Sequence, residues 1–310
     1  MTDDDGLQLA RDTLKTVSGL AGGDAANLAI TRLGGLTNLV FKAGDFCLRI
    51  PGKGTEGYID RANEAVAARE AARAGVAPEV VHFDGASGVM LTRFIEGAVT
   101  MSPDFFRQRK GAPARAARAL RKLHASGARF PFRFELFSMI DGYLNVLSAK
   151  TVDLPEGYHD GLAEAETVRA ALDAHPLPLA ACHCDPLCEN FLDTGKRMWV
   201  VDWEYSGMND PLWDLGDLSV EAGFDAAQDD EMIAAYFGGA PRPDQRGRMV
   251  IYKAMCDLLW TLWGLIQHTN RNPADDFMAY ALNRFGRCRA LMADPTFAGH
   301  VKAVAAGPGG

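Results

Sequence analysis

The sequence lacks an excess of basic residues and any regular pattern of cysteines. Lys and Arg number 32 against 40 Asp and Glu, which gives a formal net charge of −8. A nucleic acid polymer is therefore not an expected partner, because clustered basic residues hold phosphate backbones. The six cysteines show no framework spacing, and 310 residues can bury a core without disulfide bonds. These absences favour a cytoplasmic protein with reduced thiols.

A signal peptide and a long apolar run are also missing. The first ten residues, MTDDDGLQLA, are acidic, whereas a signal peptide has a basic and then an apolar segment. The longest apolar stretch, 250–266, is short for a bilayer and contains Lys253 and Asp257. We expect no membrane span and a buried core helix at this stretch. Residues 2–6 and 307–310 are expected to be frayed, because of their charge and their glycines.

The residue pattern changes near residues 93–97. Before this point, short apolar segments between glycine turns predict strands over 29–33, 39–42, 46–50, 79–83 and 89–94, with a helix over 60–74. After it, helical spacing predicts helices over 105–125, 158–174, 229–237, 246–268 and 275–292. The expected fold class is α+β, with a small antiparallel-sheet lobe at 1–96 and a larger helical lobe at 97–310. A site is expected in the cleft between the lobes.

The densest group of reactive side chains lies in the segment CHCDPLCENF and the apolar strand after it. Asp185 follows a histidine by two residues, Asn190 comes five residues later, and Asp202 follows the next strand. Kinase-type enzymes use this arrangement to place a base for the substrate hydroxyl and two oxygen ligands for Mg²⁺. A polar turn between two strands would explain the loop alone, but not an Asp at this distance. The sequence predicts Asp185 as the catalytic base and Asn190 and Asp202 as metal ligands.

The first lobe contains candidates for nucleotide binding. The segment GGLTN lies between two predicted strands, where glycines let backbone N–H groups approach phosphates, so Gly35, Thr37 and Asn38 are candidates. A plain hairpin turn explains these glycines equally well. Arg49 ends an apolar strand and Glu64 lies on the next helix, which is how kinases position the α- and β-phosphates, although a lysine is usual there. A solvated arginine at a strand end is the alternative.

These segments together resemble one family. The set GGLTN, LRIPG, DRANE, HCDPLCEN and VDWEYSGMNDPLWDLGD is similar to the choline/ethanolamine kinase branch of the aminoglycoside-phosphotransferase-like, protein-kinase-like superfamily, from about residue 30 to about residue 292. The resemblance implies a protein-kinase-like fold, ATP and Mg²⁺ as cofactors, and phosphorylation of the hydroxyl of choline or ethanolamine. It also implies that Asp214 braces the catalytic loop and that the backbone of 92–95, including Phe94 and Ile95, meets adenine.

The acceptor site is predicted on the C-terminal helices. Trp260 and Trp263 are three residues apart and share a helix face, a spacing that by itself is more typical of an aromatic core. The resemblance adds Tyr205, Glu221 and Tyr280 and implies that the five residues line the site. Aromatic faces and one carboxylate suit a quaternary ammonium, which cannot donate hydrogen bonds and is attracted to the rings.

Three other classes of protein remain open. Another small-molecule kinase of this fold could act on an aminoglycoside, thiamine or a sugar. A protein kinase is disfavoured, because the segment between Asp202 and Asp214 is too short for an activation loop. A non-catalytic binding protein of the same fold is possible on fold alone. The presence of Asp185, Asn190 and Arg49 together with Asp202 argues against it, because a degenerate site usually loses a metal ligand.

Overall fold

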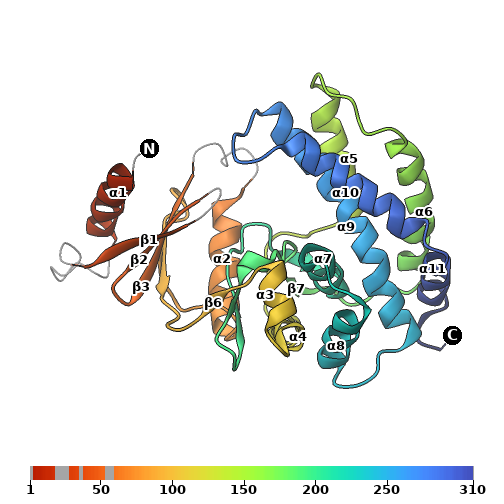
Figure 1. The fold of residues 1–310 in the computed structure, drawn as a ribbon, viewed down its shortest axis with the longest axis horizontal. Coiled ribbons are helices and arrows are strands. Elements are labelled where there is room, and N and C mark those ends of the chain that lie inside the picture. The colour runs from red at the N-terminus through yellow and green to blue at the C-terminus, as the bar shows by residue number, and fades with distance from the viewer. Residues whose placement is uncertain (1–2, 18–27, 35–37, 53–58, 310) are drawn as a thin grey trace.

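The computed structural model describes residues 3–17, 28–34, 38–52 and 59–309 of the chain. It has two lobes, which lie side by side (Figure 1). The N-lobe, at the left of Figure 1, consists of a five-stranded sheet with helices α1 and α2. The C-lobe, at the right, is mostly helical. The predicted α+β class, with a sheet-based lobe followed by a helical lobe, is confirmed.

The sheet of the N-lobe is antiparallel throughout. Its strands occur in the order β1-β2-β3-β5-β4. They are β1 (Ile30–Gly34), β2 (Asn38–Ala43), β3 (Phe46–Pro51), β4 (Val80–Phe83) and β5 (Met90–Arg93). Phe41 pairs with Leu48 in the register, and Leu48 pairs with Leu91. All three side chains are fully buried, because paired residues point to the same face of a sheet and form one apolar surface.

Helix α1 (Asp3–Thr16) packs against that apolar surface. The prediction of a frayed segment at residues 2–6 is wrong for the described residues from Asp3 onward, because the helix begins there. Ala10 and Leu14 are buried in a cluster with the strands. A helix that is polar outside one stripe gains most of its stability from packing, so the sequence alone does not reveal it. At the other end, Gly307–Gly309 form a 3₁₀ turn rather than a frayed tail.

Helix α2 (Arg61–Arg73) lies between the sheet and the C-lobe (Figure 1). Asp60 caps it, because its carboxylate accepts hydrogen bonds from the backbone N–H groups of Ala62 (2.9 Å) and Asn63 (3.0 Å). The predicted helix over 60–74 therefore includes both capping residues. Beyond the helix, the carbonyl of Val76 accepts a hydrogen bond from the N–H of Val200 at 2.9 Å. This bond ties the end of α2 to the C-lobe.

The C-lobe is built around the long helix α9 (Pro243–Thr269). The helices that pack most closely on it are α10 (Phe277–Met292), α7 (Leu212–Ala222), α11 (Phe297–Ala306) and α5 (Leu136–Ser148). The other helices are α3 (Pro103–Gln108), α4 (Ala112–His124), α6 (Tyr158–Ala174), α8 (Ala226–Phe237) and the 3₁₀ turn η2 (Cys188–Asn190). Two small sheets pair β10 (Gly207–Asn209) with β7 (Ala180–Cys182), and β8 (Phe191–Asp193) with β6 (Val99–Thr100) and β9 (Met198–Val200).

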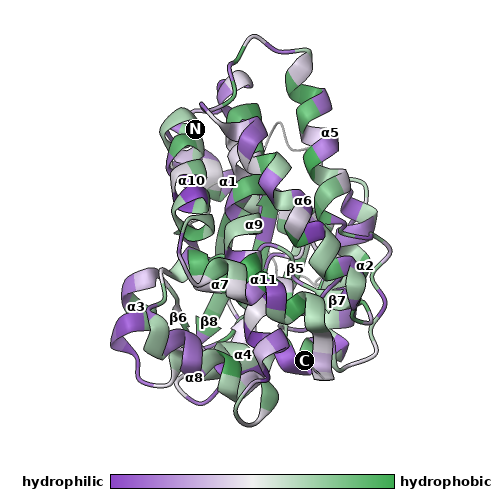
Figure 2. Ribbon diagram, turned by 90° about the vertical axis from the view of Figure 1, so that its right-hand side faces the viewer, coloured by the Kyte–Doolittle hydropathy of each residue, from purple (hydrophilic) through white to green (hydrophobic). Residues whose placement is uncertain are grey.

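Helix α9 is the one helix among the described residues that is long and apolar enough to cross a membrane. Of its most apolar window, 78% is buried inside the protein. Met255, Leu258 and Leu262 are fully buried. In Figure 2, hydrophilic residues (purple) and hydrophobic residues (green) alternate along the neighbouring helices, as expected for helices that cover a core with one side. The structure agrees with the buried core helix predicted at 250–266.

One predicted helix is divided. The single helix expected over 105–125 is wrong, because α3 ends at Gln108 and α4 begins at Ala112. Gly111 between them has φ of 75°, a left-handed conformation that glycine adopts without steric cost. The predicted helices over 158–174, 229–237, 246–268 and 275–292 correspond to α6, α8, α9 and α10. The pattern did not predict α5, α7 or α11.

The chain passes from one lobe to the other after β5. Strand β5 ends at Arg93 in the N-lobe sheet, and β6, which begins at Val99, pairs with β8 in the C-lobe. The boundary expected between residues 96 and 97 lies in this connection.

Candidate functional site

The loop 183–190 follows β7. Asp214, in the first turn of α7, holds this loop by hydrogen bonds to its backbone. The fully buried carboxylate of Asp214 accepts hydrogen bonds from the backbone N–H groups of His183 (2.8 Å) and Cys184 (2.9 Å). His124 Nε2 lies 2.9 Å from the same carboxylate, and Trp213 donates from Nε1 to the carbonyl of Cys184 at 3.1 Å. Cys184 has φ of 68°, which is strained for a residue other than glycine. Hydrogen bonds on both sides of Cys184 therefore hold a strained turn next to Asp185.

Asp185 comes next and is half-buried. Its backbone carbonyl accepts a hydrogen bond from Asn190 Nδ2 at 3.1 Å, so the structure brings these two predicted residues together. Burial, followed by the negative charges of Glu221 and Asp202, raises the pKa of the Asp185 carboxyl well above its usual range. A carboxyl group in this setting binds a proton more readily than an exposed one.

Asp202 follows β9 and lies beside the same loop. The N–H of Val201 donates to the carbonyl of Asn190 at 2.9 Å. Asp202 has φ of 66°, so it is, after Cys184, the second non-glycine residue of the site with a strained backbone. Its Oδ1 lies 3.4 Å from Nη1 of Arg49, which belongs to the N-lobe. Burial raises the pKa of Asp202, while Arg49 opposes that effect.

Arg49 and Glu64 form an ion pair between β3 and α2. Their side chains are 6% and 0% exposed, so this pair is almost entirely removed from water. Arg49 Nη2 also donates to the carbonyl of Gly88 at 3.1 Å. Arg61 donates from Nη1 to Glu64 (2.7 Å) and to Glu204 of the C-lobe (3.1 Å). Burial, followed by a neighbouring carboxylate, raises the pKa of Glu204 to about 7.

Arg61 and Glu204 were not among the residues predicted from the sequence. The signal in the sequence that could have indicated Glu204 is its position two residues after Asp202. Its connection to α2 is visible only once the two lobes are folded together.

The predicted contacts to the nucleotide are described only in part. Gly35 and Thr37 lie outside the described residues. Asn38 is buried, and its Oδ1 has no hydrogen-bond partner among the described residues. In the segment 92–95, the N–H of Phe94 donates to a carbonyl in the β2–β3 turn at 2.9 Å, and the carbonyl of Ile95 lies 3.5 Å from the N–H of Ala98. The N–H of Phe94 is therefore already used within the protein.

The oxygen atoms between the lobes fit a divalent cation. Carboxylate oxygens of Glu64, Asp202 and Glu204 lie within 4.8 Å of one another. The amide nitrogen of Asn190 donates to the loop backbone, which leaves its oxygen available to a cation. Carboxylate and amide oxygens are the ligands that Mg²⁺ prefers, and the set contains no thiolate or imidazole.

The four predicted aromatic residues form one cluster. Trp260 and Trp263 on α9 have ring centroids 6.2 Å apart, and Trp263 lies 5.8 Å from Tyr280 on α10. Trp263 Nε1 donates to the hydroxyl of Tyr205 at 3.1 Å, and the Tyr205 ring lies 5.6 Å from Trp260. Phe277 adds a fifth ring, 5.5 Å from Trp263, that the sequence did not indicate. Trp260 is buried, whereas Trp263, Tyr205 and Tyr280 are half-buried.

The predicted acidic residue of the acceptor site is already paired. Glu221 on α7 forms an ion pair with Arg284 of α10, which also lies 3.1 Å from Asp257 of α9. One turn before Glu221, Asp217 is 1% exposed, and Cys256 Sγ lies 2.7 Å from its Oδ1. Oδ2 of Asp217 has no hydrogen-bond partner among the described residues. Burial, followed by the charge of Glu221, raises the pKa of Asp217 well above its usual range.

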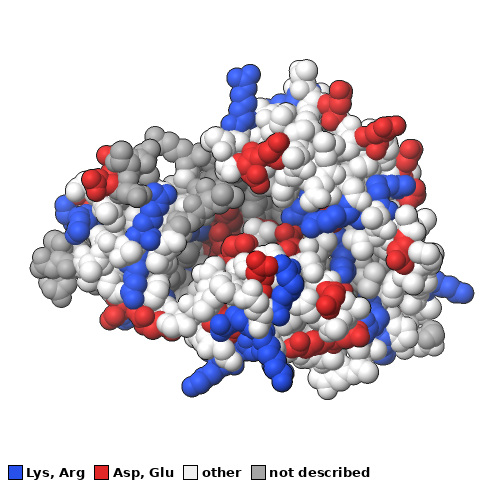
Figure 3. Space-filling model, viewed as in Figure 1, with Lys and Arg blue, Asp and Glu red and all other residues white. Residues whose placement is uncertain are grey.

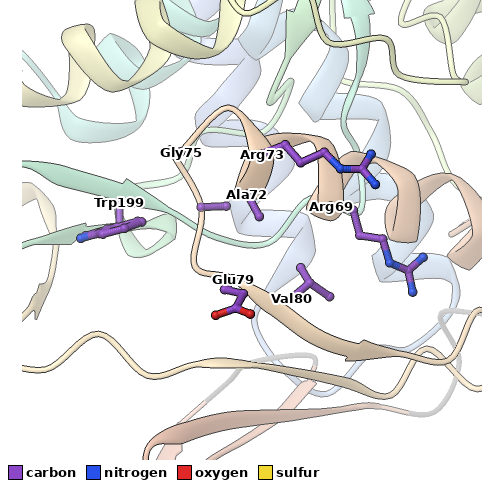
Figure 4. Close-up of a pocket in the computed structure, with 8 residues that line it drawn as sticks. Arg69, Ala72, Arg73, Gly75, Glu79, Val80 and Trp199 are labelled. Atoms are coloured by element: carbon purple, nitrogen blue, oxygen red, sulfur yellow. The ribbon is translucent and has the colours of Figure 1, made fainter. Parts of the chain in front are cut away.

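The space between the lobes is open at the surface. Figure 3 shows the face hollowed between the two lobes, with acidic side chains inside the hollow. A cavity of about 430 Å³ lies elsewhere, between the C-terminal end of α2 and β9, and Arg69, Arg73 and Trp199 are among its lining residues (Figure 4). It contains no residue of the motifs described above, so the reactive groups belong to the cleft and not to this cavity.

A comparison with protein families finds one match over most of the chain. The model of the phosphotransferase enzyme family matches residues 30–249. Among solved structures, a choline/ethanolamine kinase family protein from Mesorhizobium loti is 68% identical in sequence with a TM-score of 0.91, and the match covers 97% of this chain and 100% of that one.

More distant relatives agree with this match. The protein LicA of Haemophilus influenzae is 27% identical over 276 residues, which cover 86% of this chain and 80% of LicA. A LicA structure in complex with AMP is 26% identical with a TM-score of 0.69, and the match covers 86% of this chain and 91% of that one.

Proposed function

The chain belongs to the choline/ethanolamine kinase branch of the phosphotransferase enzyme family, and we propose that it transfers the γ-phosphate of ATP, with Mg²⁺, to the hydroxyl of choline. The position of Asp185 carries the proposal. Its carboxyl lies close enough to interact with the charge of Glu221 beside the aromatic cluster and with those of Asp202 and Glu204 at the oxygen cluster. A base in this position suits an acceptor hydroxyl that must meet a phosphate in line.

In this proposal Asp185 accepts the proton of the acceptor hydroxyl. Its loop is fixed by Asp214 through the N–H groups of His183 and Cys184, so the carboxylate needs little reorganisation when the acceptor binds. The cationic charges brought by the metal and the acceptor favour the ionised form of Asp185, and thus offset the effect of burial on its pKa.

The nucleotide is proposed to bind between the lobes. Arg49, held by Glu64, contacts its phosphates, and Asn38, Phe94 and Ile95 lie on the same lobe as proposed contacts. The bound AMP of the related LicA supports a nucleotide site in this fold. Asn190 and Asp202 would hold Mg²⁺, which neutralises charge on the phosphate oxygens. Residues 1–96 are thus proposed as the nucleotide-binding lobe and 97–310 as the catalytic and acceptor-binding lobe.

The acceptor is proposed to bind on the aromatic cluster of Tyr205, Trp260, Trp263 and Tyr280. A trimethylammonium group has no N–H to donate, so ring faces and nearby carboxylates are the surfaces that recognise it. An aminoglycoside carries several amines and would require several hydrogen-bond acceptors, whereas this wall is mainly aromatic. We further propose a cytoplasmic setting, in keeping with six cysteines that are all free thiols.

Ethanolamine is the second candidate. Its ammonium group donates hydrogen bonds, and Oδ2 of Asp217 is a buried acceptor that has no partner among the described residues. A primary amine that reached this oxygen would satisfy it, whereas a trimethylammonium group would not. Choline would therefore be recognised by the aromatic rings, and ethanolamine by Asp217.

A substrate panel tests the proposal. ADP release is measured with choline, ethanolamine, thiamine and kanamycin, each with ATP or GTP and with or without Mg²⁺. We expect the highest kcat/KM for choline with ATP, and release slowed by at least ~10²-fold in Asp185→Asn. Faster turnover of thiamine or kanamycin would assign another acceptor, and no turnover of any acceptor would support a binding protein.

A further inference from the structure

Arg284 is a buried cation beside the proposed acceptor site. Its side chain is 4% exposed, and it forms ion pairs with Glu221 of α7 and Asp257 of α9. Its guanidinium carbon lies 4.8 Å from the centroid of the Tyr280 ring, one turn earlier on α10. Two of the five residues proposed to recognise the cationic head of the acceptor, Glu221 and Tyr280, are therefore already in contact with an internal cation.

Asp257 does not depend on Arg284 for its neutralisation. Arg287, one turn further on α10, bonds to the same carboxylate from Nη2 at 2.6 Å and from Nε at 3.0 Å. Arg287 also donates to the carbonyl of Val220 at 3.3 Å. If Arg284 served only to neutralise Asp257, Arg287 would make it redundant. What Arg284 alone supplies is its contact with Glu221 and with the face of Tyr280.

The contact matters because Arg284 and the cationic head of the acceptor would bind the same two groups, a tyrosine ring and a carboxylate. A guanidinium over a tyrosine ring and against a carboxylate makes the two interactions that an alkylammonium ligand would make. Removal of Arg284 would leave Glu221 charged and without this partner, at the edge of a pocket that the acceptor enters. An incoming cation would then meet a stronger negative potential and a free ring face.

We propose that Arg284 is a specificity-determining residue that competes with the cationic head of the acceptor for Glu221 and Tyr280. This inference rests on the proposed function, in which the acceptor is a cationic amino alcohol. Arg284 thereby weakens the binding of charged acceptors and limits how strongly the pocket prefers them over neutral alcohols of the same shape.

The test compares Arg284→Met with Arg287→Met, which removes the neighbouring arginine of the same helix but not the contact with Glu221. Steady-state KM is measured for choline and for dimethylbutanol, its neutral isostere with carbon in place of nitrogen. We expect Arg284→Met to lower the KM for choline by roughly threefold to tenfold, the scale of one net hydrogen-bond interaction. The KM values for the isostere and for ATP should stay unchanged, as should all three in Arg287→Met.

A second pair of variants ties the effect to Glu221. In the Glu221→Gln background, Arg284→Met should give no decrease in the KM for choline, because the carboxylate for which Arg284 and choline compete is absent. Arg284→Lys retains a buried cation if the methionine variant fails to fold. Lysine keeps the charge but lacks the planar guanidinium that lies over the Tyr280 ring, so a smaller decrease is expected.

The outcomes separate the inference from the function on which it rests. An unchanged or higher KM for choline in the folded Arg284 variants, or an equal decrease for the neutral isostere, would overturn the role of Arg284. If the wild-type protein phosphorylates neither choline nor ethanolamine, the proposed function itself fails.

Discussion

Arg61 of the N-lobe donates a hydrogen bond to Glu204 of the C-lobe, Nη1 to Oε2, at 3.1 Å. The same nitrogen also bonds to Glu64, the partner of Arg49. The side chain of Arg61 thus links Glu204 with the Arg49–Glu64 pair, which is proposed to face the phosphates. The two halves of the proposed nucleotide and metal site are connected by protein contacts alone.

We expect Arg61→Gln to raise the KM for ATP by roughly threefold to tenfold, because Glu64 loses a cation and Glu204 loses a nearly buried partner. The KM for choline should change little, since the acceptor cluster lies on α9 and α10. Steady-state kinetics with each substrate varied in turn measures both. Arg73→Gln is the control, because Arg73 lies on the same helix but is mostly exposed. A change confined to the choline KM would contradict the assignment.

Asp185→Asn should fold and bind nucleotide but lose at least ~10²-fold in kcat, the usual scale for a positioned base. Glu189→Gln removes an exposed carboxylate from the same loop and should keep full activity. Nucleotide binding by calorimetry and turnover by ADP release measure the two effects. Near-wild-type turnover by the asparagine variant would remove Asp185 from its proposed role.

Asp202→Ala should abolish Mg²⁺-dependent turnover, and Asn190→Ala should raise the Mg²⁺ concentration needed for half-maximal rate. Carboxylates remain nearby at Glu64 and Glu204, but both are engaged by arginines. Activity is followed as MgCl₂ is titrated at fixed ATP. An alanine variant at 202 with an unchanged Mg²⁺ curve would show that the metal binds elsewhere.

Trp263→Ala should raise the KM for choline by about tenfold, since a cation over desolvated rings gains up to about 2 kcal/mol. Trp263 is the ring that contacts Tyr205, Tyr280 and Trp260 at once. Trp263→Phe keeps a ring and should lose less, and Trp199→Ala removes a tryptophan remote from the cluster. Should all three variants show the same KM for choline, the aromatic cluster is not the acceptor site.

Asp217→Asn should stabilise the protein at neutral pH. The pKa of Asp217 is raised in the folded protein above the ordinary value of 3.8, so its contribution to stability is complete below about pH 4 and is lost as the pH rises through the folded pKa. The amide of asparagine does not ionise, so it carries no free-energy cost from a buried charge. The free energy of unfolding in urea, measured at pH 5 and pH 8, should show a larger advantage of the variant at pH 8. An advantage that shrinks with rising pH would contradict the raised pKa.

The sequence predicted the parts of the site that depend on local spacing. Asp185, Asn190 and Asp202 are within one loop and the next strand, so their relative positions follow from a short stretch of chain. Helix α6 was predicted with its bounds, 158–174, because the residues that it buries recur every three or four positions: Tyr158, Gly161, Ala165, Val168 and Ala171.

What the sequence did not predict depends on partners distant in the chain. Every residue of α7 from Leu212 to Val220 is buried, so it shows no periodic polar face, although it carries Asp214 and Glu221. Helix α1 is stable because a sheet covers its one apolar stripe. Arg284 reads as an ordinary charged residue on an exposed helix until α7 and α9 place Glu221 and Asp257 against it.

The hydrogen bond from Val200 to the carbonyl of Val76 has a consequence for regulation. It holds the end of α2 on the C-lobe, while the other end of the helix already carries the formed pair of Glu64 and Arg49. Helix α2, which carries Glu64, is therefore already in place beside Arg49 in the folded protein. We expect the rate of the enzyme to follow the concentrations of acceptor and nucleotide directly.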